Sequence, residues 1–129
     1  MKKIIVFLSV SIFAIAVLAF ADETGKKELS PAQKLMQERA AQLTAMNKAL
    51  GAGDFKAVAK NADELAAESK MTGEKLPSPL AKDITLAMSA LAKDASAEAA
   101  KDDVAGVKTK LEGIKGKCGE CHVKIRDKK

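Results

Sequence analysis

The sequence has no tryptophan and no tyrosine, and its aromatic content is only 3%. Aromatic and β-branched residues favour strands, whereas alanine, lysine, glutamate, leucine and methionine, which are abundant here, favour helices. No stretch shows the alternation of apolar and polar residues that marks a half-buried strand. The length of 129 residues is that of one ordinary domain. The sequence therefore predicts a single all-α domain.

The chain also has little of what nucleic-acid binding or catalysis requires. It has no arginine-rich surface with interleaved aromatic residues on which bases could stack, so we expect no nucleic-acid partner. It has a single histidine, no paired-carboxylate signature and no nucleotide-binding glycine loop, so we do not expect an enzyme. The formal net charge is +5. Such a mild positive charge suits weak steering toward an acidic protein partner.

The N-terminus has the pattern of a secretory signal peptide. Lys2 and Lys3 precede an apolar run over residues 4–21, which ends in Ala19-Phe20-Ala21, a small-residue cleavage signature. We expect cleavage after Ala21, a mature domain over residues 22–129, and a periplasmic location. The alternative is an uncleaved membrane anchor, because the run approaches transmembrane length. The acidic pair Asp22-Glu23 directly after the run favours cleavage, so we expect no stable membrane insertion.

Four segments of the mature chain have helical periodicity, and each follows a capping residue. The predicted N-caps are Ser30, Asp54, Ser78 and Asp103, and the first belongs to a capping box with Pro31 and Gln33. Gly73, Pro77 and Pro79 predict a connecting loop over residues 71–79. The pattern predicts an antiparallel four-helix bundle. The residues expected to face its core are Met36, Ala40, Leu43 and Leu50 with Met46 beside them; Phe55, Val58, Ala62, Leu65 and Ser69; Leu80, Ile84, Ala87, Leu91 and Ala95; and Val104, Val107, Leu111, Ile114, Cys118, Cys121 and Ile125.

All the cysteine and histidine of the chain lies in one five-residue stretch, Cys118-Gly119-Glu120-Cys121-His122. Cys-x-x-Cys-His is the attachment signature of a c-type haem. Two thiols one helical turn apart can each form a thioether with the same porphyrin, and His122 is then the proximal ligand of the iron. Both cysteines fall on the apolar stripe of the last segment. The haem is therefore expected inside the bundle, against the end of the fourth helix.

Three other interpretations of this stretch are weaker. A structural zinc site needs about four protein ligands, and the chain offers two cysteines and one histidine. A redox-active Cys-x-x-Cys is expected near a βαβ pattern, which is not visible here. A plain disulfide would leave the adjacent histidine without a role.

The sixth ligand of the iron is expected to be Met36. In antiparallel neighbours the start of the first helix lies beside the end of the fourth, so Met36 and His122 are at similar heights. Met46 is ten residues further on, roughly 15 Å along the helix axis. Met88 lies in the middle of its helix, and Met71 in the predicted loop. The alternative is that Met36 only fills space in the core, as methionine commonly does.

The placement of the motif in the last helix of a bundle resembles the class II cytochromes c, which include the five-coordinate cytochromes c′ and the low-spin cytochrome c-556 type. The resemblance covers residues 30–128, and residues 116–128 look like the family's closing segment. It implies one covalent haem c, and an Arg126 that lies near the proximal imidazole or a haem propionate. Lys34-Leu35-Met36 looks like the segment in which low-spin members place their methionine ligand. The resemblance further implies a homodimer through the first two helices.

The leading hypothesis is a periplasmic monohaem electron carrier with His122 and Met36 as axial ligands and an acidic redox partner. The alternative is a five-coordinate protein of the cytochrome c′ kind that binds nitric oxide or carbon monoxide. A third hypothesis, from another class, is a haem-free structural or metal-handling helical protein. The lysines near the haem end, Lys115, Lys117, Lys124, Lys128 and Lys129, are candidates for steering a partner or are ordinary solvated side chains.

Overall fold

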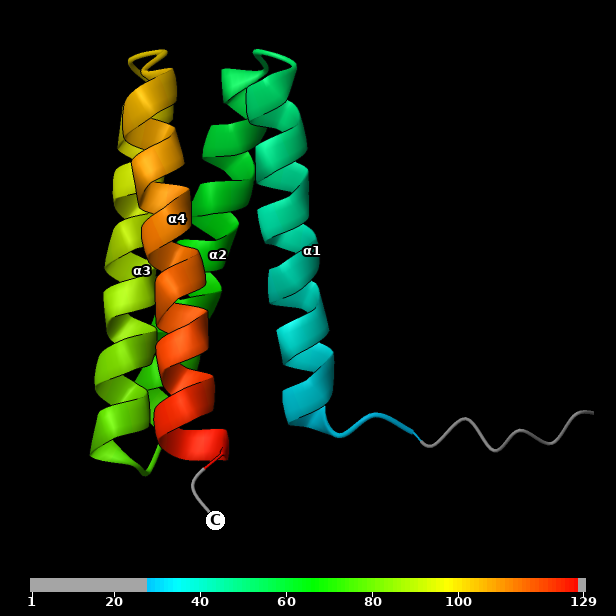
Figure 1. Ribbon diagram of the computed structural model, residues 1–129, viewed down its shortest axis with the longest axis vertical. Helices are drawn as coiled ribbons and strands as arrows, with labels where there is room; N and C mark the ends of the chain where they lie inside the picture. Colours follow the sequence, from blue (N-terminus) through cyan, green and yellow to red (C-terminus); the bar gives the residue numbers. More distant parts are fainter. Residues whose placement is uncertain (1–27, 128–129) are drawn as a thin grey trace, which may run out of the picture.

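The computed structural model describes residues 28–127, which are all-helical and contain no strand (Figure 1). The signal peptide predicted over residues 1–21 lies outside the described residues. The elements are α1 (Pro31–Gly51), α2 (Phe55–Lys75), α3 (Pro79–Ala99), α4 (Val104–Cys121) and a turn of π-helix, η1 (His122–Arg126). An all-α fold of four α-helices is thus confirmed. None of the helices over residues 28–127 is both long and apolar enough to cross a membrane.

The four α-helices begin where the capping residues predicted. Ser30 Oγ accepts a hydrogen bond from the Gln33 N–H at 3.2 Å, and Gln33 Oε1 accepts one from the Ser30 N–H at 2.9 Å, which completes the capping box. The other three caps each accept a backbone N–H three residues on. They are Asp54, Ser78 and Asp103.

The loop predicted over residues 71–79 is wrong in its first half, because α2 continues to Lys75. Gly73 is buried within this helix, and a Cβ on it would lie 3.0 Å from Leu86 Cδ2. The glycine therefore allows close approach of α2 to α3, and it does not form a turn. The helix ends at Lys75, with Leu76 as its extended C-cap residue, so the connection spans Leu76–Ser78.

The helices run antiparallel, and the start of α1 lies at the same end of the bundle as the end of α4 (Figure 1). The α2 and α3 helices pack closely along their length, α3 packs on α4, and α1 contacts α2 far more than it contacts α4. Small side chains permit this close packing. The core is formed by Met46, Val58, Ala62, Leu65, Met88, Ala92, Ala95, Ala99, Val107, Leu111 and Ile114.

The inward face predicted for α1 is partly wrong. Ala40 is exposed and Met36 is 37% exposed, whereas the buried residues of α1 are Arg39 and Met46. The helix is rotated relative to the prediction because it packs mainly on α2, and its side toward α4 is left more open. Met46, predicted to lie beside the stripe, is fully buried.

The face predicted for α3 is also shifted. Leu80 is exposed and Ala87 and Leu91 are only half-buried, while Thr85 and Met88 are buried. Helix α3 packs against both α2 and α4, so its buried face is broader than a single stripe. The α4 stripe is confirmed at Val107, Leu111 and Ile114, and Val104 at its start is exposed.

Candidate haem site

The cysteine–histidine motif lies at the end of α4, where the helix widens into η1. The Asp127 N–H donates to the His122 carbonyl at 2.9 Å, a bond across five residues instead of four. Short π-helical turns of this kind often occur at functional sites. The π-helical turn begins at His122, whose own backbone is still α-helical, with φ −62° and ψ −47° and its N–H donating to the Cys118 carbonyl.

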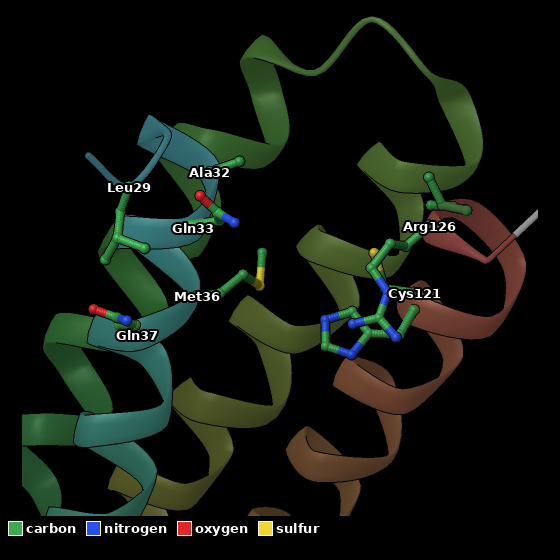
Figure 2. A pocket seen from close by; sticks show the side chains of 9 residues that line it. Leu29, Ala32, Gln33, Met36, Gln37, Cys121 and Arg126 are labelled. Carbon is green, nitrogen blue, oxygen red and sulfur yellow. The ribbon is translucent and has the colours of Figure 1, made fainter. Parts of the chain in front are cut away.

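A cavity of about 630 Å³ lies between the start of α1 and the end of α4 with η1 (Figure 2). This volume falls within the range of about 300–1,000 Å³ typical of small-molecule sites. Met36 projects from α1 toward Cys121 and Arg126 on the opposite side (Figure 2), and His122 also lines the cavity. The remaining lining residues are Leu29, Ala32, Gln33, Gln37 and Ile125. The structure thus brings Met36 and His122 to one cavity.

A smaller cavity continues toward the centre of the bundle and shares Met36, Cys121 and His122 with the first. Cys118 lines it, so both thiols border the same space. Both cysteines are free and half-buried. Cys118, Cys121 and His122 thus border one space. A covalently attached haem needs this donor set, two thiols and an imidazole. The residues present therefore fit this group.

Cys118 lies deeper in the bundle than the other residues of the motif. Its Sγ is 3.8 Å from the Sδ of Met88, a buried residue of α3. Burial raises the pKa of the Cys118 thiol, and the positive charge of Arg39 opposes this effect. Met88, set aside in the sequence analysis because it lies mid-helix, is thus a second methionine at the smaller cavity.

Arg39, which no sequence pattern singled out, also lines the smaller cavity. It is 5% exposed, and burial lowers the pKa of its guanidinium, an effect opposed by the charges of Cys118 and Glu68. Two spacings in the sequence indicate that Arg39 shares a helix face with Met36 and Met46. It follows Met36 by three residues and precedes Met46 by seven, and both spacings keep residues on one side of a helix.

Arg126, expected near the imidazole or a propionate, lines the larger cavity together with His122. Its Nε lies 2.7 Å from Asp127 Oδ1, and both side chains are exposed. This carboxylate raises the pKa of Arg126. Within the motif, Glu120 accepts hydrogen bonds from Lys117 Nζ at 2.8 Å and Lys124 Nζ at 2.7 Å, which lower its pKa to about 2.

Comparison with models of protein families, with curated proteins and with solved structures finds no match to this chain. The site must therefore be interpreted from its own residues. Within residues 28–127, no three side chains of histidine, cysteine, aspartate or glutamate come together as a metal ion would require.

Proposed function

We propose that this protein is a periplasmic c-type cytochrome that carries one electron, with a single haem attached at Cys118 and Cys121 and held by His122 and Met36. The main support is that Met36 on α1 and the motif at the end of α4 border one cavity. The motif also resembles that of the class II cytochromes c, and the helical architecture agrees with this resemblance.

The side chains around the cavity suit this function. A bound haem supplies a one-electron couple between Fe(II) and Fe(III). His122 and Met36 come from two different helices, so the packing of α1 against the rest of the bundle sets how closely the two donors approach. The apolar groups of Leu29, Ala32 and Ile125 line the cavity and limit the access of water. Methionine ligation and an apolar surrounding both favour the reduced state.

A second candidate function is gas binding at an open distal face. Met36 is 37% exposed and the side of α1 toward α4 is loosely packed, so the methionine has room to stand away from the iron. In that case the iron is five-coordinate, and the protein binds carbon monoxide or nitric oxide.

Optical spectra of the protein matured with covalent haem test the proposal. We expect wild type to be low-spin, to show the methionine–iron charge-transfer band, and to resist carbon monoxide when reduced. Met36→Ala should lose the band and bind carbon monoxide. Met88→Leu is the matched control, because it removes the other methionine of the site and should keep the band.

The other outcomes distinguish the alternatives. A high-spin wild type that binds carbon monoxide readily supports gas binding. Loss of the band in Met88→Leu but not in Met36→Ala would assign the ligand to Met88. A protein that acquires no covalent haem in a host with a cytochrome c maturation system would contradict both haem functions and favour a haem-free role.

A further inference from the structure

Arg39 is a buried cation that no carboxylate neutralises at close range. The residue is 5% exposed, and its Nε and Nη2 atoms are buried without a hydrogen-bond partner among residues 28–127. Within the same residues, no carboxylate oxygen lies within 4.0 Å of its guanidinium, whereas Lys117 and Arg126 each have such a partner. Little water screens a charge in this position, so it acts strongly on any charge that changes nearby.

Glu68 on α2 compensates this charge only in part. Its carboxylate attracts the guanidinium of Arg39, but from beyond ion-pair distance. The side chain is half-buried and accepts a hydrogen bond from Gln42 Nε2 at 3.2 Å. On α4, the cation at the same cavity is Lys117, which is paired with Glu120. The surroundings of Arg39 therefore leave a net positive charge at this place in the bundle.

The position of Arg39 relates this charge to the haem site. Arg39 lines the smaller cavity together with Cys118, Cys121 and His122. A haem attached to the two thiols has its thioether edge at this cavity, and its propionates leave the opposite edge of the ring. Arg39 therefore acts on the haem through its charge across the ring, without pairing with a haem carboxylate.

We propose that Arg39 raises the reduction potential of the haem by opposing the positive charge that oxidation adds. When one electron leaves for the redox partner, Fe(II) becomes Fe(III) and the net charge of the haem increases by one. A fixed, buried guanidinium repels this added charge and so favours the reduced form. The proposal rests on the proposed function, since it requires haem in the cavity, and it assigns Arg39 a role separate from ligation by Met36.

The size of the effect follows from the Coulomb interaction. Two unit charges about 10 Å apart at an effective dielectric constant of about 20 change an equilibrium roughly tenfold, which for one electron is about 59 mV. We therefore expect Arg39→Gln to lower the potential by roughly this amount. Arg39→Lys should stay closer to wild type because lysine keeps the positive charge.

Potentiometric titration of the covalent holoprotein, followed by its optical spectrum, tests the proposal. Glu68→Gln should raise the potential, because it removes the anion that partly offsets Arg39, and a packing role of these residues does not predict opposite signs. Arg126→Gln is the matched control. It removes a cation that is exposed and paired with Asp127, so its shift should be smaller and should fade at high salt, whereas the shift of Arg39→Gln should persist.

Two results would overturn the proposal, provided that the variant keeps the axial ligation of wild type. One is a potential that stays unchanged or rises in Arg39→Gln, and the other is a shift of Glu68→Gln in the same direction as that of Arg39→Gln. If Arg39→Gln does not fold or changes its ligation, a potential near that of wild type in Arg39→Lys together with a raised one in Glu68→Gln supports the proposal, and any other combination contradicts it. Failure of the proposed function is recognised separately, because wild type would then carry no haem or would lack the methionine–iron band.

Discussion

Two arginines lie at the two adjoining cavities, Arg39 at the smaller and Arg126 at the larger, and their surroundings differ. Arg39 is buried and has no carboxylate within 4.0 Å among residues 28–127, whereas Arg126 is exposed and lies 2.7 Å from Asp127. A buried charge interacts strongly with a ligand because little water screens it, while an exposed ion pair contributes little. The sequence alone pointed to Arg126 as a neighbour of the site, because this residue follows His122 by four positions in the chain. The burial of Arg39 is not.

Glu120, within the Cys-x-x-Cys-His stretch, should titrate at unusually low pH. Its hydrogen bonds with Lys117 and Lys124 lower its pKa from 4.5 to about 2. A lowered folded-state pKa means that the charged group stabilises the fold above pH 4.5, and that this stabilisation is lost as the pH falls toward 2. The effect on stability is small because the group is exposed.

Carbon-detected NMR of the Glu120 carboxyl group checks this prediction. We expect a midpoint near pH 2 in wild type, and a midpoint closer to 4.5 when Lys117 and Lys124 are both replaced by methionine. A wild-type midpoint near 4.5 would contradict the ion-pair geometry.

At the scale of the elements, the end of α2 shows how a glycine can support a helix instead of ending it. Gly73 lies against Thr85 and Leu86, so that α2 continues for about one more turn alongside α3. Glycine costs a helix interior about 1 kcal/mol relative to alanine. The close approach of the two helices offsets this cost, and the actual turn is formed by the residues around Pro77.

Replacing Gly73 by valine should therefore destabilise the protein by about 1–3 kcal/mol, the usual cost of overpacking a well-packed core. The control is Gly51→Ala at the end of α1, where a Cβ would meet no atom within 4 Å. This change should be neutral or should stabilise by up to about 1 kcal/mol. Urea unfolding followed by circular dichroism measures both. Equal effects of the two substitutions would contradict the packing argument.

For the whole molecule, the uneven packing of α1 is the main structural feature. Helices α2, α3 and α4 form the compact part, and α1 is attached chiefly through α2, with Met46 as its fully buried apolar side chain. The larger cavity is lined by the start of α1 and the end of α4 with η1, and α1 contacts α4 much less than it contacts α2. The arrangement leaves space for a planar group between α1 and the motif, and it makes the position of Met36 depend on how α1 docks.

Hydrogen exchange should reveal this unevenness. In haem-free protein we expect the amides of the first half of α1 to exchange faster than those in the middle of α3, because fewer packed contacts protect them. Covalent haem held by Met36 should slow exchange around residues 33–40 and leave α3 nearly unchanged. Mass-spectrometric exchange of both forms measures this. Equal protection of α1 and α3 without haem would contradict the packing described here.

The sequence determined the number of helices, their start sites and the identity of the motif. Local physics sets these features: Ser30, Asp54, Ser78 and Asp103 satisfy N–H groups only a few residues away, and Cys118, Cys121 and His122 are adjacent along the chain. The chain order of antiparallel helices also sufficed to predict that Met36 and His122 lie at the same end of the bundle, while ligation of iron by either residue stays a prediction.

The tertiary structure alone decided how each helix is rotated and which residues it buries. Periodicity gives the spacing of a stripe, but the direction in which the stripe faces depends on which neighbours contact the helix. Helix α1 packs mainly on α2, and so Arg39 is buried and Ala40 is exposed. The π-helical turn at His122, the fit of Gly73 against Leu86 and the proximity of Met88 to Cys118 follow for the same reason: each depends on residues distant in the chain or on backbone geometry that no local pattern specifies.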